Sequence, residues 1–333
     1  MEIRRVQITG GSSYVLTLPK EWIKSANIQK NDPLGIHIQT NGTLLITPRM
    51  TRDQQKIKEI DLQEITKLDY LFRRLIAAYI AGYTTIKINA NKRISPEIRS
   101  TIRKFTQTTI GQEVVEETDQ YIMLKDLLNP TEMPFDRTIK RMQIILKGMH
   151  EDIIRALETK DDQLVSDVIQ RDAEIDRLHW LIARQHNSIL QNMSLADKMN
   201  ITINLSSTYF TISRIIERIG DHIVKIAENV QNLHDLHTDS IIIEKIKLSS
   251  ELALTIFANS IYSFFRKDIK SSNQNIDSVQ DLEAQCEEID NLALKENGII
   301  AVSVGYIVES IRRIGEYAED ISENVINYLT SQN

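Results

Sequence analysis

The sequence contains little of what small secreted proteins use for stability. Cys286 is the single cysteine among 333 residues, so no internal disulfide can form and a reducing compartment is expected. Glycine and proline together contribute 17 residues, about 5% of the chain against roughly 12% in average usage. This shortage disfavours a turn-rich all-β protein and favours long helices.

Long hydrophobic runs are also missing. The most apolar stretch, residues 252–265, has 14 residues and includes Thr255, Asn259 and two serines, so it is too short and too polar to span a bilayer. The first eleven residues contain no apolar core of the kind that signal peptides need. These features predict a soluble cytoplasmic protein.

The net charge of -6 conceals two parts of opposite sign. Residues 1–130 carry 19 Lys and Arg against 14 Asp and Glu, a balance of +5, whereas residues 131–333 carry 21 against 32, a balance of -11. A basic part followed by an acidic part suggests different partners for each. A balance of +5 over 130 residues is also ordinary for a protein surface, so charge alone leaves nucleic-acid binding open.

Residues 1–49, here called the N-terminal module, are rich in short strand patterns. Apolar residues recur in strand fashion over 3–8, 14–18 and 34–38, and Asn41-Gly42 signals a hairpin to a return strand at 43–47. Pro19 can serve as the first residue of a short helix over 20–25. Because four strands in about 48 residues bury little apolar surface, we expect this module to need a partner.

The stretch Thr-Gly-Gly-Ser-Ser-Tyr-Val-Leu-Thr-Leu-Pro-Lys-Glu-Trp at 9–22, followed by Asn31-Asp32 and a hairpin, resembles the AbrB/SpoVT swapped-hairpin module. The resemblance implies a barrel of two interleaved copies, a homodimer that binds DNA. The candidate phosphate contacts are cations and small turn residues: Arg4, Arg5, Ser12, Ser13, Lys20 and Lys24. The family often has Lys or Arg in its first turn, where this chain has glycines and serines, so a module used only for dimerisation is the alternative.

Residues 50–130 predict a small α/β unit. We expect a helix over 61–81, a strand at 84–88, a helix over 95–109 and a strand pair at 113–117 and 121–124. The second helix has a strong start, because Ser95 can cap it and Pro96 suits its first position. The unit contains no dinucleotide-binding, phosphate-loop or nucleophile-elbow motif, so we interpret it as a spacer, with a second dimer contact and a ligand sensor as alternatives.

Residues 131–333 predict a mainly α-helical part. We expect six helices, at about 135–159, 161–191, 195–233, 240–269, 274–297 and 299–330. An internal repeat runs through them, because 216–230 and 311–325 agree at eight of fifteen positions and 174–178 matches 288–292. The order predicts two three-helix bundles, repeat 1 (about 131–235) and repeat 2 (about 236–333). Glycine recurs at Gly220 and Gly315, which predicts close approach of neighbouring helices.

The repeated Arg-Ile-Gly-Asp/Glu segment and the preceding Glu-Ile-Asp resemble the PhoU family over about 131–330. The resemblance implies a pair of three-helix bundles, metal-binding acidic pairs and a role in phosphate uptake and signalling through a phosphate transporter or a sensor kinase. Joined to an AbrB-like module, it predicts a dimeric DNA-binding regulator that senses metal or phosphate. The alternative is a regulator that docks on the transporter or kinase and uses the N-terminal module only for dimerisation.

Two acidic pairs in repeat 1 are the candidate metal ligands. Asp172 and Asp176 are four residues apart and share a helix face, as do Glu217 and Asp221 on the next helix. Four adjacent carboxylates repel one another, and a divalent or trivalent cation such as iron, Mg, Mn or Zn relieves that repulsion. The alternative is that they pair with neighbouring arginines on a solvated face: Arg171, Arg177, Arg214 and Arg218.

Repeat 2 departs from this pattern. Cys286 stands where repeat 1 has Asp172, and Arg312 stands where it has Glu217, so Asp290 and Glu316 remain as a weaker second site. An arginine in a ligand position can neutralise the acids without a metal. The sequence therefore predicts a first metal site more strongly than a second.

An enzymatic role finds little support in the sequence. A ferritin-like di-iron site needs Glu-x-x-His on two helices, and the nearest match is Asp176-Arg-Leu-His179. The His234 and His237 pair is expected near a helix end and solvated. We therefore predict a non-enzymatic protein, with a metal-buffering or catalytic bundle as the remaining alternative.

Overall fold

The computed structural model describes residues 2–38, 42–48, 56–234, 236 and 238–332. It divides the chain into two compact units, 1–54 and 55–333, which we treat separately. Within the described ranges, no helix combines the length and the apolar character needed to cross a membrane.

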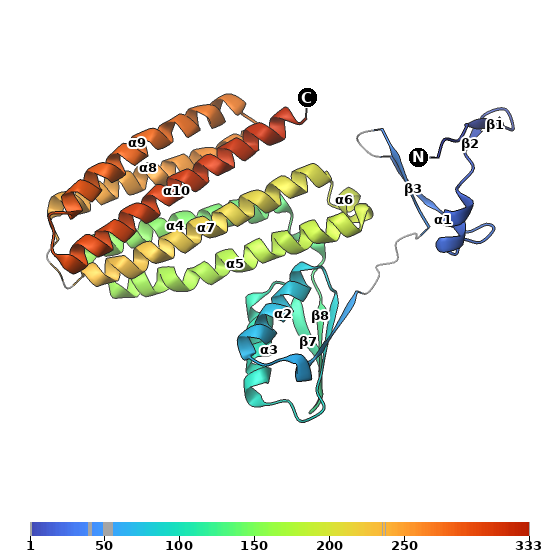
Figure 1. Cartoon of the computed structure of the whole chain (residues 1–333), viewed down its shortest axis with the longest axis horizontal. Helices are drawn as coiled ribbons and strands as arrows, with labels where there is room; N and C mark the ends of the chain where they lie inside the picture. The colour runs from blue at the N-terminus through green and yellow to red at the C-terminus, as the bar shows by residue number, and fades with distance from the viewer. Residues whose placement is uncertain (1, 39–41, 49–55, 235, 237, 333) are drawn as a thin grey trace. The chain divides into compact units, whose positions relative to one another are not determined.

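The first unit consists of two short hairpins and one helix (Figure 1). Strand β1 (Gln7–Thr9) pairs antiparallel with β2 (Ser13–Val15), and β3 (Gly35–Ile38) pairs antiparallel with β4 (Leu44–Thr47). Helix α1 (Lys20–Ser25) lies between the hairpins in sequence. Gly10 and Gly11 turn the first hairpin with φ of 61° and 85°, values that glycine adopts without steric cost. Both predicted hairpins are confirmed; Asn41 of the second turn lies outside the described residues.

The second unit begins with the α/β part. Its elements are β5 (Ile57–Asp61), η1 (Leu62–Glu64), α2 (Leu68–Ile80), β6 (Thr85–Asn89), α3 (Pro96–Thr108), β7 (Gln112–Glu117) and β8 (Tyr121–Asp126). The strand order is β5-β6-β8-β7, with β5 parallel to β6 and the other pairs antiparallel. Buried side chains from α2, α3 and the sheet, among them Leu71, Ile88 and Phe105, form its core.

One sequence prediction for this part needs correction, and one is confirmed. The helix predicted over 61–81 begins only at Leu68, because residues 57–61 form strand β5 and a short 3-10 turn follows. The second helix starts as predicted, since Ser95 Oγ accepts a hydrogen bond from the Ile98 amide at 3.4 Å and Pro96 is its first residue.

The remaining residues form the helical part. After η2 (Pro130–Glu132) come α4 (Phe135–Thr159), α5 (Asp162–Gln191), α6 (Met193–Lys198), α7 (Ile203–Leu233), α8 (Ser240–Arg266), α9 (Ile269–Ala293) and α10 (Gly298–Thr330). Helices α4, α5 and α7 form one three-helix bundle and α8, α9 and α10 form the other. The two bundles pack together mainly through α7 and α10, which run side by side in Figure 1. The predicted pair of three-helix bundles is confirmed.

Two predicted helix boundaries are wrong. One helix was expected over 195–233, but the chain breaks between Lys198 and Ile203, because Asn200 takes a φ of 50° and Thr202 Oγ caps α7. Helix α9 begins at Ile269 rather than 274, because the Asp268 carboxylate accepts a hydrogen bond from the Ser271 amide at 3.0 Å and so caps the helix earlier.

The recurring glycines confirm the predicted close approach of helices. A Cβ on Gly220 of α7 would lie 3.1 Å from Asp172 Oδ1 of α5. A Cβ on Gly315 of α10 would lie 2.3 Å from Leu282 Cδ2 of α9, which is shorter than real contacts allow. Each repeat therefore uses its glycine to bring the last two helices of the bundle together.

Helix α5 also reaches the α/β part. Arg184, Asn187 and Gln191 donate hydrogen bonds to the last carbonyl groups of α2, those of residues 79–81. The final carbonyls of a helix have no partner within it, so α5 supplies partners from another element. The α/β part and the first bundle are thus joined by directed contacts.

Candidate metal centre and nucleic-acid interface

Four carboxylates from repeat 1 approach one another between α5 and α7. Asp172 and Asp176 extend from α5, and Glu217 and Asp221 extend from α7; we call these four residues the α5–α7 cluster. The Asp176 carboxyl is repelled by all three of the others, and Asp172 is repelled by Asp221. The structure therefore brings together the four residues that the sequence singled out.

Partial burial and mutual repulsion disfavour ionisation of this cluster. Burial raises the pKa of Asp172 to about 6, and the nearby Asp221 carboxylate adds to the shift. Burial raises the pKa of Asp176 to about 7, with further contributions from its three acidic neighbours. The pKa values of Glu217 and Asp221 are raised as well, chiefly by burial. A nearby positive charge would stabilise the ionised cluster.

The charges of Arg214 and Arg218 offset part of the rise in the pKa of Glu217, but the neighbouring arginines form no ion pair with the cluster among the described residues. Across the described residues, no Lys or Arg forms an ion pair with a member of the α5–α7 cluster. Arg171 instead pairs with Asp152 and, at 2.9 Å, with Asp167. Asp172 Oδ1 is buried and has no hydrogen-bond partner. An orphaned carboxylate oxygen among three other acids leaves room for a cationic ligand.

The donor set of the cluster fits a hard cation. All four side chains offer carboxylate oxygens, the ligands that Mg²⁺, Mn²⁺ and Ca²⁺ prefer. In the described part of the chain, no group of three or more Asp, Glu, His or Cys side chains already has the arrangement of a formed metal site. The four residues therefore supply the type of donor that such a cation prefers, but in this structure they are not arranged around a common centre.

A half-buried histidine follows the α5 acids along the helix, and the sequence predicts no site role for it. His179 lies three residues after Asp176, forms a hydrogen bond between Nδ1 and Ser213 Oγ at 3.0 Å, and stacks on Phe210. Burial lowers the pKa of His179 to about 4, so the ring is neutral near pH 7. The sequence signal for His179 is its i+3 spacing from Asp176, which places the two side chains on one helix face but matches a di-iron motif only in part.

Repeat 2 has a different arrangement at the equivalent place. Arg312 donates hydrogen bonds to Asp290 at 2.7 Å and to Glu309 at 2.6 Å. Arg313 donates to Glu309 at 3.0 Å and to Glu316 at 2.7 Å. Both acids of the predicted second site are therefore engaged by arginines, and Glu309, which the sequence reasoning missed, joins the two guanidinium groups.

The six candidate DNA contacts all lie in the N-terminal module. Arg4 pairs with Glu2 and donates to Thr17 Oγ1 at 3.0 Å, whereas Arg5 is exposed. Ser12 and Ser13 are exposed in and beside the β1–β2 turn. Lys20 and Lys24 are exposed on α1 and make no ion pair within the described ranges.

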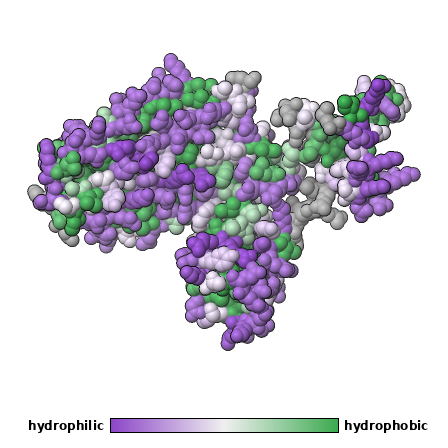
Figure 2. Space-filling model, viewed as in Figure 1, coloured by the Kyte–Doolittle hydropathy of each residue, from purple (hydrophilic) through white to green (hydrophobic). Residues whose placement is uncertain are grey.

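The same module exposes apolar side chains. Ile8, Tyr14, Ile36 and Ile38 are 64%, 76%, 63% and 81% exposed, and hydrophobic atoms are visible on its surface in Figure 2. None of the described residues in this module is buried. Strands that alternate apolar residues without a covered face are typical of a module that is incomplete without a partner.

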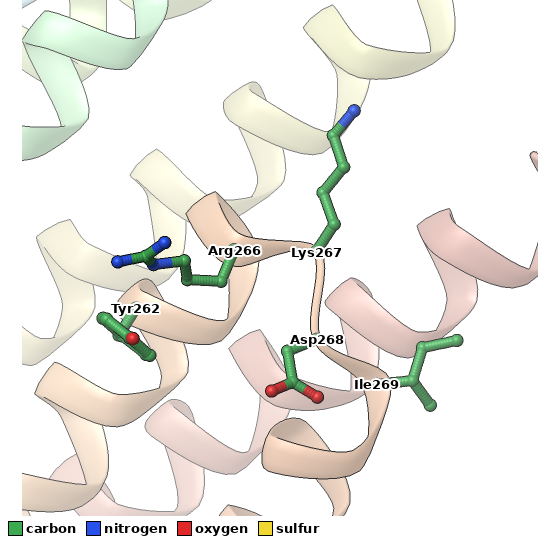
Figure 3. Close-up of a pocket in the computed structure, with 5 residues that line it drawn as sticks. All are labelled: Tyr262, Arg266, Lys267, Asp268 and Ile269. Atoms are coloured by element: carbon green, nitrogen blue, oxygen red, sulfur yellow. The ribbon is translucent and has the colours of Figure 1, made fainter.

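A shallow hollow at the α8–α9 turn carries no recognisable site chemistry. Its volume is about 580 Å³, and it is lined by Tyr262, Arg266, Lys267, Asp268 and Ile269 (Figure 3). Asp268 is engaged in capping α9, and the Arg266 guanidinium lies 5.4 Å from the centre of the Tyr262 ring. These side chains serve the turn itself.

Comparison with known families finds one match in the helical part and another in the N-terminal module. Residues 139–230 match the PhoU domain, and residues 7–54 match the family described as antidote-toxin recognition MazE, bacterial antitoxin. The chain joins a PhoU domain to a MazE/AbrB-like domain. Both predicted resemblances are thereby confirmed.

Known relatives align with the PhoU part. The phosphate-specific transport system accessory protein PhoU homolog 1 of Thermotoga maritima is 23% identical over 201 residues, which cover 59% of this chain and 85% of that protein. A PhoU homolog of Caulobacter vibrioides is 34% identical over 92 residues, 28% of this chain and 37% of that protein. The uncharacterized protein MJ1641 of Methanocaldococcus jannaschii is 23% identical over 218 residues, 62% of this chain and 66% of that protein.

Two solved structures show the same helical fold. PhoU from Pseudomonas aeruginosa aligns with a TM-score of 0.53 at 18% identity, covering 60% of this chain and 96% of that one. The phosphate transport system regulatory protein PhoU from Streptococcus pneumoniae aligns with a TM-score of 0.52 at 16% identity, covering 60% and 94%. The PhoU-like architecture predicted for residues 131–333 is confirmed as a fold.

Proposed function

We propose that this protein is a non-enzymatic regulator of phosphate uptake or phosphate signalling that binds DNA as a dimer and responds to a metal cation. The observation that carries the proposal is the presence, in one chain, of a PhoU domain with an acidic cluster and a basic MazE/AbrB-like module. Relatives of the PhoU part are named as accessory or regulatory proteins of phosphate transport.

Dimerisation through the N-terminal module is supported by its exposed apolar strands. A module in which none of the described residues is buried gains little stability from packing alone, and a second copy would cover Ile36, Ile38 and their neighbours. The exposed area is spread over both hairpins, as expected for strands that interleave with those of another copy. We therefore take the functional DNA-binding unit to be a dimer.

DNA binding is supported by where the positive charge lies. Within residues 1–50 there are six Lys and Arg against three Asp and Glu, whereas residues 131–333 carry a balance of -11. The acidic part repels a phosphate backbone, so attraction must come from the N-terminal module. A dimer places two copies of Arg5, Lys20 and Lys24 on one assembly.

In the PhoU part, Asp172, Asp176, Glu217 and Asp221 would hold the cation. A bound divalent cation would neutralise these carboxylates directly, which the nearby Arg214, Arg218 and Lys225 do only in part. Helices α5 and α7 carry the four acids, so a cation that relieves the repulsion between these acids lets the two helices approach each other. The same helix α5 contacts the α/β part, which precedes it in the chain.

The DNA-binding proposal can be tested by fluorescence anisotropy with a labelled promoter-sized duplex. Wild type should bind at about 50 mM salt and lose most of its affinity at about 200 mM. Arg4→Ala/Arg5→Ala should abolish binding, and Lys20→Ala/Lys24→Ala should weaken it. A matched control, Lys270→Ala/Lys295→Ala, removes the same charge from exposed positions of the acidic part and should leave binding unchanged or slightly stronger.

A folded wild-type protein that does not bind DNA at 50 mM salt would contradict the DNA-binding part of the proposal. The remaining explanation would then be docking on a phosphate transporter component or sensor kinase, with the N-terminal module serving dimerisation alone. Binding that survives in Arg4→Ala/Arg5→Ala would instead place the DNA contact elsewhere.

A further inference from the structure

We infer that repeat 2 takes up no metal cation, because the guanidinium groups of Arg312 and Arg313 stand in the place of one. This inference rests on the proposed function in a single respect, namely that the equivalent cluster of repeat 1 is the metal-binding half. On this inference the two bundles of the PhoU part differ: one has a cation site, and the other has an ion-pair network in its place.

The network in repeat 2 alternates acid and base without a gap. Asp290 of α9 accepts from Arg312 at 2.7 Å, and Arg312 donates to Glu309 at 2.6 Å. Glu309 also accepts from Arg313 at 3.0 Å, and Arg313 donates to Glu316 at 2.7 Å. All four contacts are charge-assisted hydrogen bonds of good length. A cation could reach these three carboxylates only by displacing both arginines.

The sequence origin of the network is a charge swap between the repeats. Arg214 and Glu217 of α7 correspond, 95 positions later, to Glu309 and Arg312 of α10. The same two helix positions therefore carry opposite charges in the two bundles. In repeat 1 the acid approaches the acids of α5, whereas in repeat 2 the base approaches Asp290 of α9.

On α9, too, repeat 2 has lost an acid that repeat 1 has at the equivalent position. Cys286 replaces the first acid of repeat 1, and its side chain is fully buried with Sγ 3.9 Å from the Val308 carbonyl oxygen. A buried thiol packed against backbone offers no oxygen donor to a hard cation. Repeat 2 thus presents three carboxylates already paired with two guanidinium groups, where repeat 1 presents four carboxylates without an ion pair in the described part of the chain.

The two bundles consequently respond differently to a cation. The α5–α7 contact depends on how its acids are neutralised, while the α9–α10 contact is neutralised by its own side chains. The Arg312–Asp290 ion pair links α10 to α9 whether or not a cation is present, and the other pairs of the network lie within α10. Changes in cation concentration are expected to act through repeat 1 alone.

Binding of Mn²⁺ to the full-length protein, measured by isothermal titration calorimetry, tests the inference. Wild type should bind at repeat 1, and Asp172→Asn/Asp176→Asn should abolish binding. In that background, adding Cys286→Asp and Arg312→Glu restores the acid pattern of repeat 1 within repeat 2, and binding should return. Circular dichroism should show that each variant is folded.

The inference would be overturned by either of two results. One is Mn²⁺ binding by Asp172→Asn/Asp176→Asn that disappears when Asp290→Asn is added. The other is a folded Cys286→Asp/Arg312→Glu variant, in the same background, that gains no Mn²⁺ binding. Failure of wild type to bind Mn²⁺ is a separate result that contradicts the metal site of repeat 1, because the repeat 2 comparison is made after repeat 1 is disabled.

A melting experiment in EDTA gives an independent readout at one matched pair of positions. Arg312→Met breaks the network and should lower the melting temperature, because Asp290 loses its counter-charge and Glu309 loses one of its two arginine partners. Glu217→Gln, at the equivalent position of repeat 1, should raise it, because one of four repelling carboxylates is removed. In saturating Mn²⁺, Glu217→Gln should instead have a lower melting temperature than wild type. The effect of Arg312→Met on the melting temperature should be unchanged. Equal signs for the two variants in EDTA would contradict the inference.

Discussion

The Asp126 carboxylate at the end of β8 accepts a hydrogen bond from the Arg184 guanidinium of α5 at 2.5 Å, and both side chains are almost completely buried. Arg184 also donates to the carbonyl oxygens of Tyr79, at 2.5 Å, and Tyr83, at 2.9 Å. One side chain thus serves an acid and two backbone groups of the α/β part, so it fixes that part against the first bundle.

Replacing Arg184 should therefore destabilise the protein strongly. Arg184→Met leaves the Asp126 charge buried without a partner, and we expect a loss of about 3–5 kcal/mol in the free energy of unfolding. Urea unfolding followed by circular dichroism measures it. As a matched control, Arg141→Met removes an exposed arginine 3.7 Å from Glu174 and should cost less than about 1 kcal/mol. Equal losses in the two variants would contradict the role assigned to Arg184.

The contribution of His150 to stability should fall as the pH is lowered from 6.5 to 4, whereas the acids of the α5–α7 cluster, whose pKa values are raised, contribute in the opposite direction. Burial lowers the pKa of this histidine to about 4, and its Nε2 lies 2.8 Å from Ser250 Oγ, across the contact between α4 and α8. The folded pKa lies below the unfolded value, so the unfolded chain binds the proton first and the contribution is present above pH 6.5 and lost toward pH 4. A shift of this size corresponds to about 3 kcal/mol.

The variant His150→Gln isolates this contribution, because it removes the titrating ring and should flatten the pH dependence of the unfolding free energy. Ser250→Ala removes the hydrogen-bond partner but keeps the ring, so it should lower stability and retain the pH dependence. A wild-type profile identical in slope to that of His150→Gln would show that His150 does not contribute.

Two glycines of α10 should respond in opposite ways to replacement by alanine. Alanine within a helix is normally favoured by about 1 kcal/mol, and Gly305 has open space around it, so Gly305→Ala should stabilise by up to that amount. At Gly315 the new Cβ would lie 2.3 Å from Leu282 Cδ2, and Leu282 is fully buried, so Gly315→Ala should destabilise by about 1–3 kcal/mol. Melting temperatures of the two variants give the comparison directly; stabilisation by both would mean that α9 and α10 can separate at little cost.

Charged residues on β3 should disrupt the proposed dimer. Ile36→Lys/Ile38→Lys places two cations on apolar positions that are 63% and 81% exposed in the single chain, and we expect light scattering to report a monomer. Ile144→Lys, at a 71% exposed position of α4, is the control and should leave the mass unchanged. An unchanged mass for Ile36→Lys/Ile38→Lys would show that this strand is not part of the interface.

The long helices and both hairpins were predictable because their signals are local. Apolar periodicity, the Ser95 cap and the glycine turns act over a few residues, and the internal repeat confirmed the order of the helices. The break between α6 and α7 was missed because it depends on Asn200 adopting a positive φ, which no apolar pattern announces. Strand β5 was missed because it is one short edge strand, paired in parallel with β6 across an intervening helix.

The positions of the acids in the candidate site were predictable, but the side chains that face them were not. Spacing alone placed Asp172 and Asp176 on one helix face, and the repeat paired them with α7. Spacing could not decide whether arginines or acids would face them, because that depends on side-chain direction across the helix contact. The answer differs between repeats, since Arg312 pairs with Asp290 whereas Arg171 pairs with Asp152 rather than with a member of the cluster.

Helix α5 connects the acidic cluster to the α/β part. It runs without interruption for 30 residues, about 45 Å at 1.5 Å per residue, and carries Asp172 and Asp176 near its middle and Arg184 closer to its end. Because Arg184 is held by Asp126 and the end of α2, a tilt of α5 at its acids must displace the α/β part in the same motion. We therefore expect a change of charge at Asp172 and Asp176 to reach the sheet of the α/β part through Arg184.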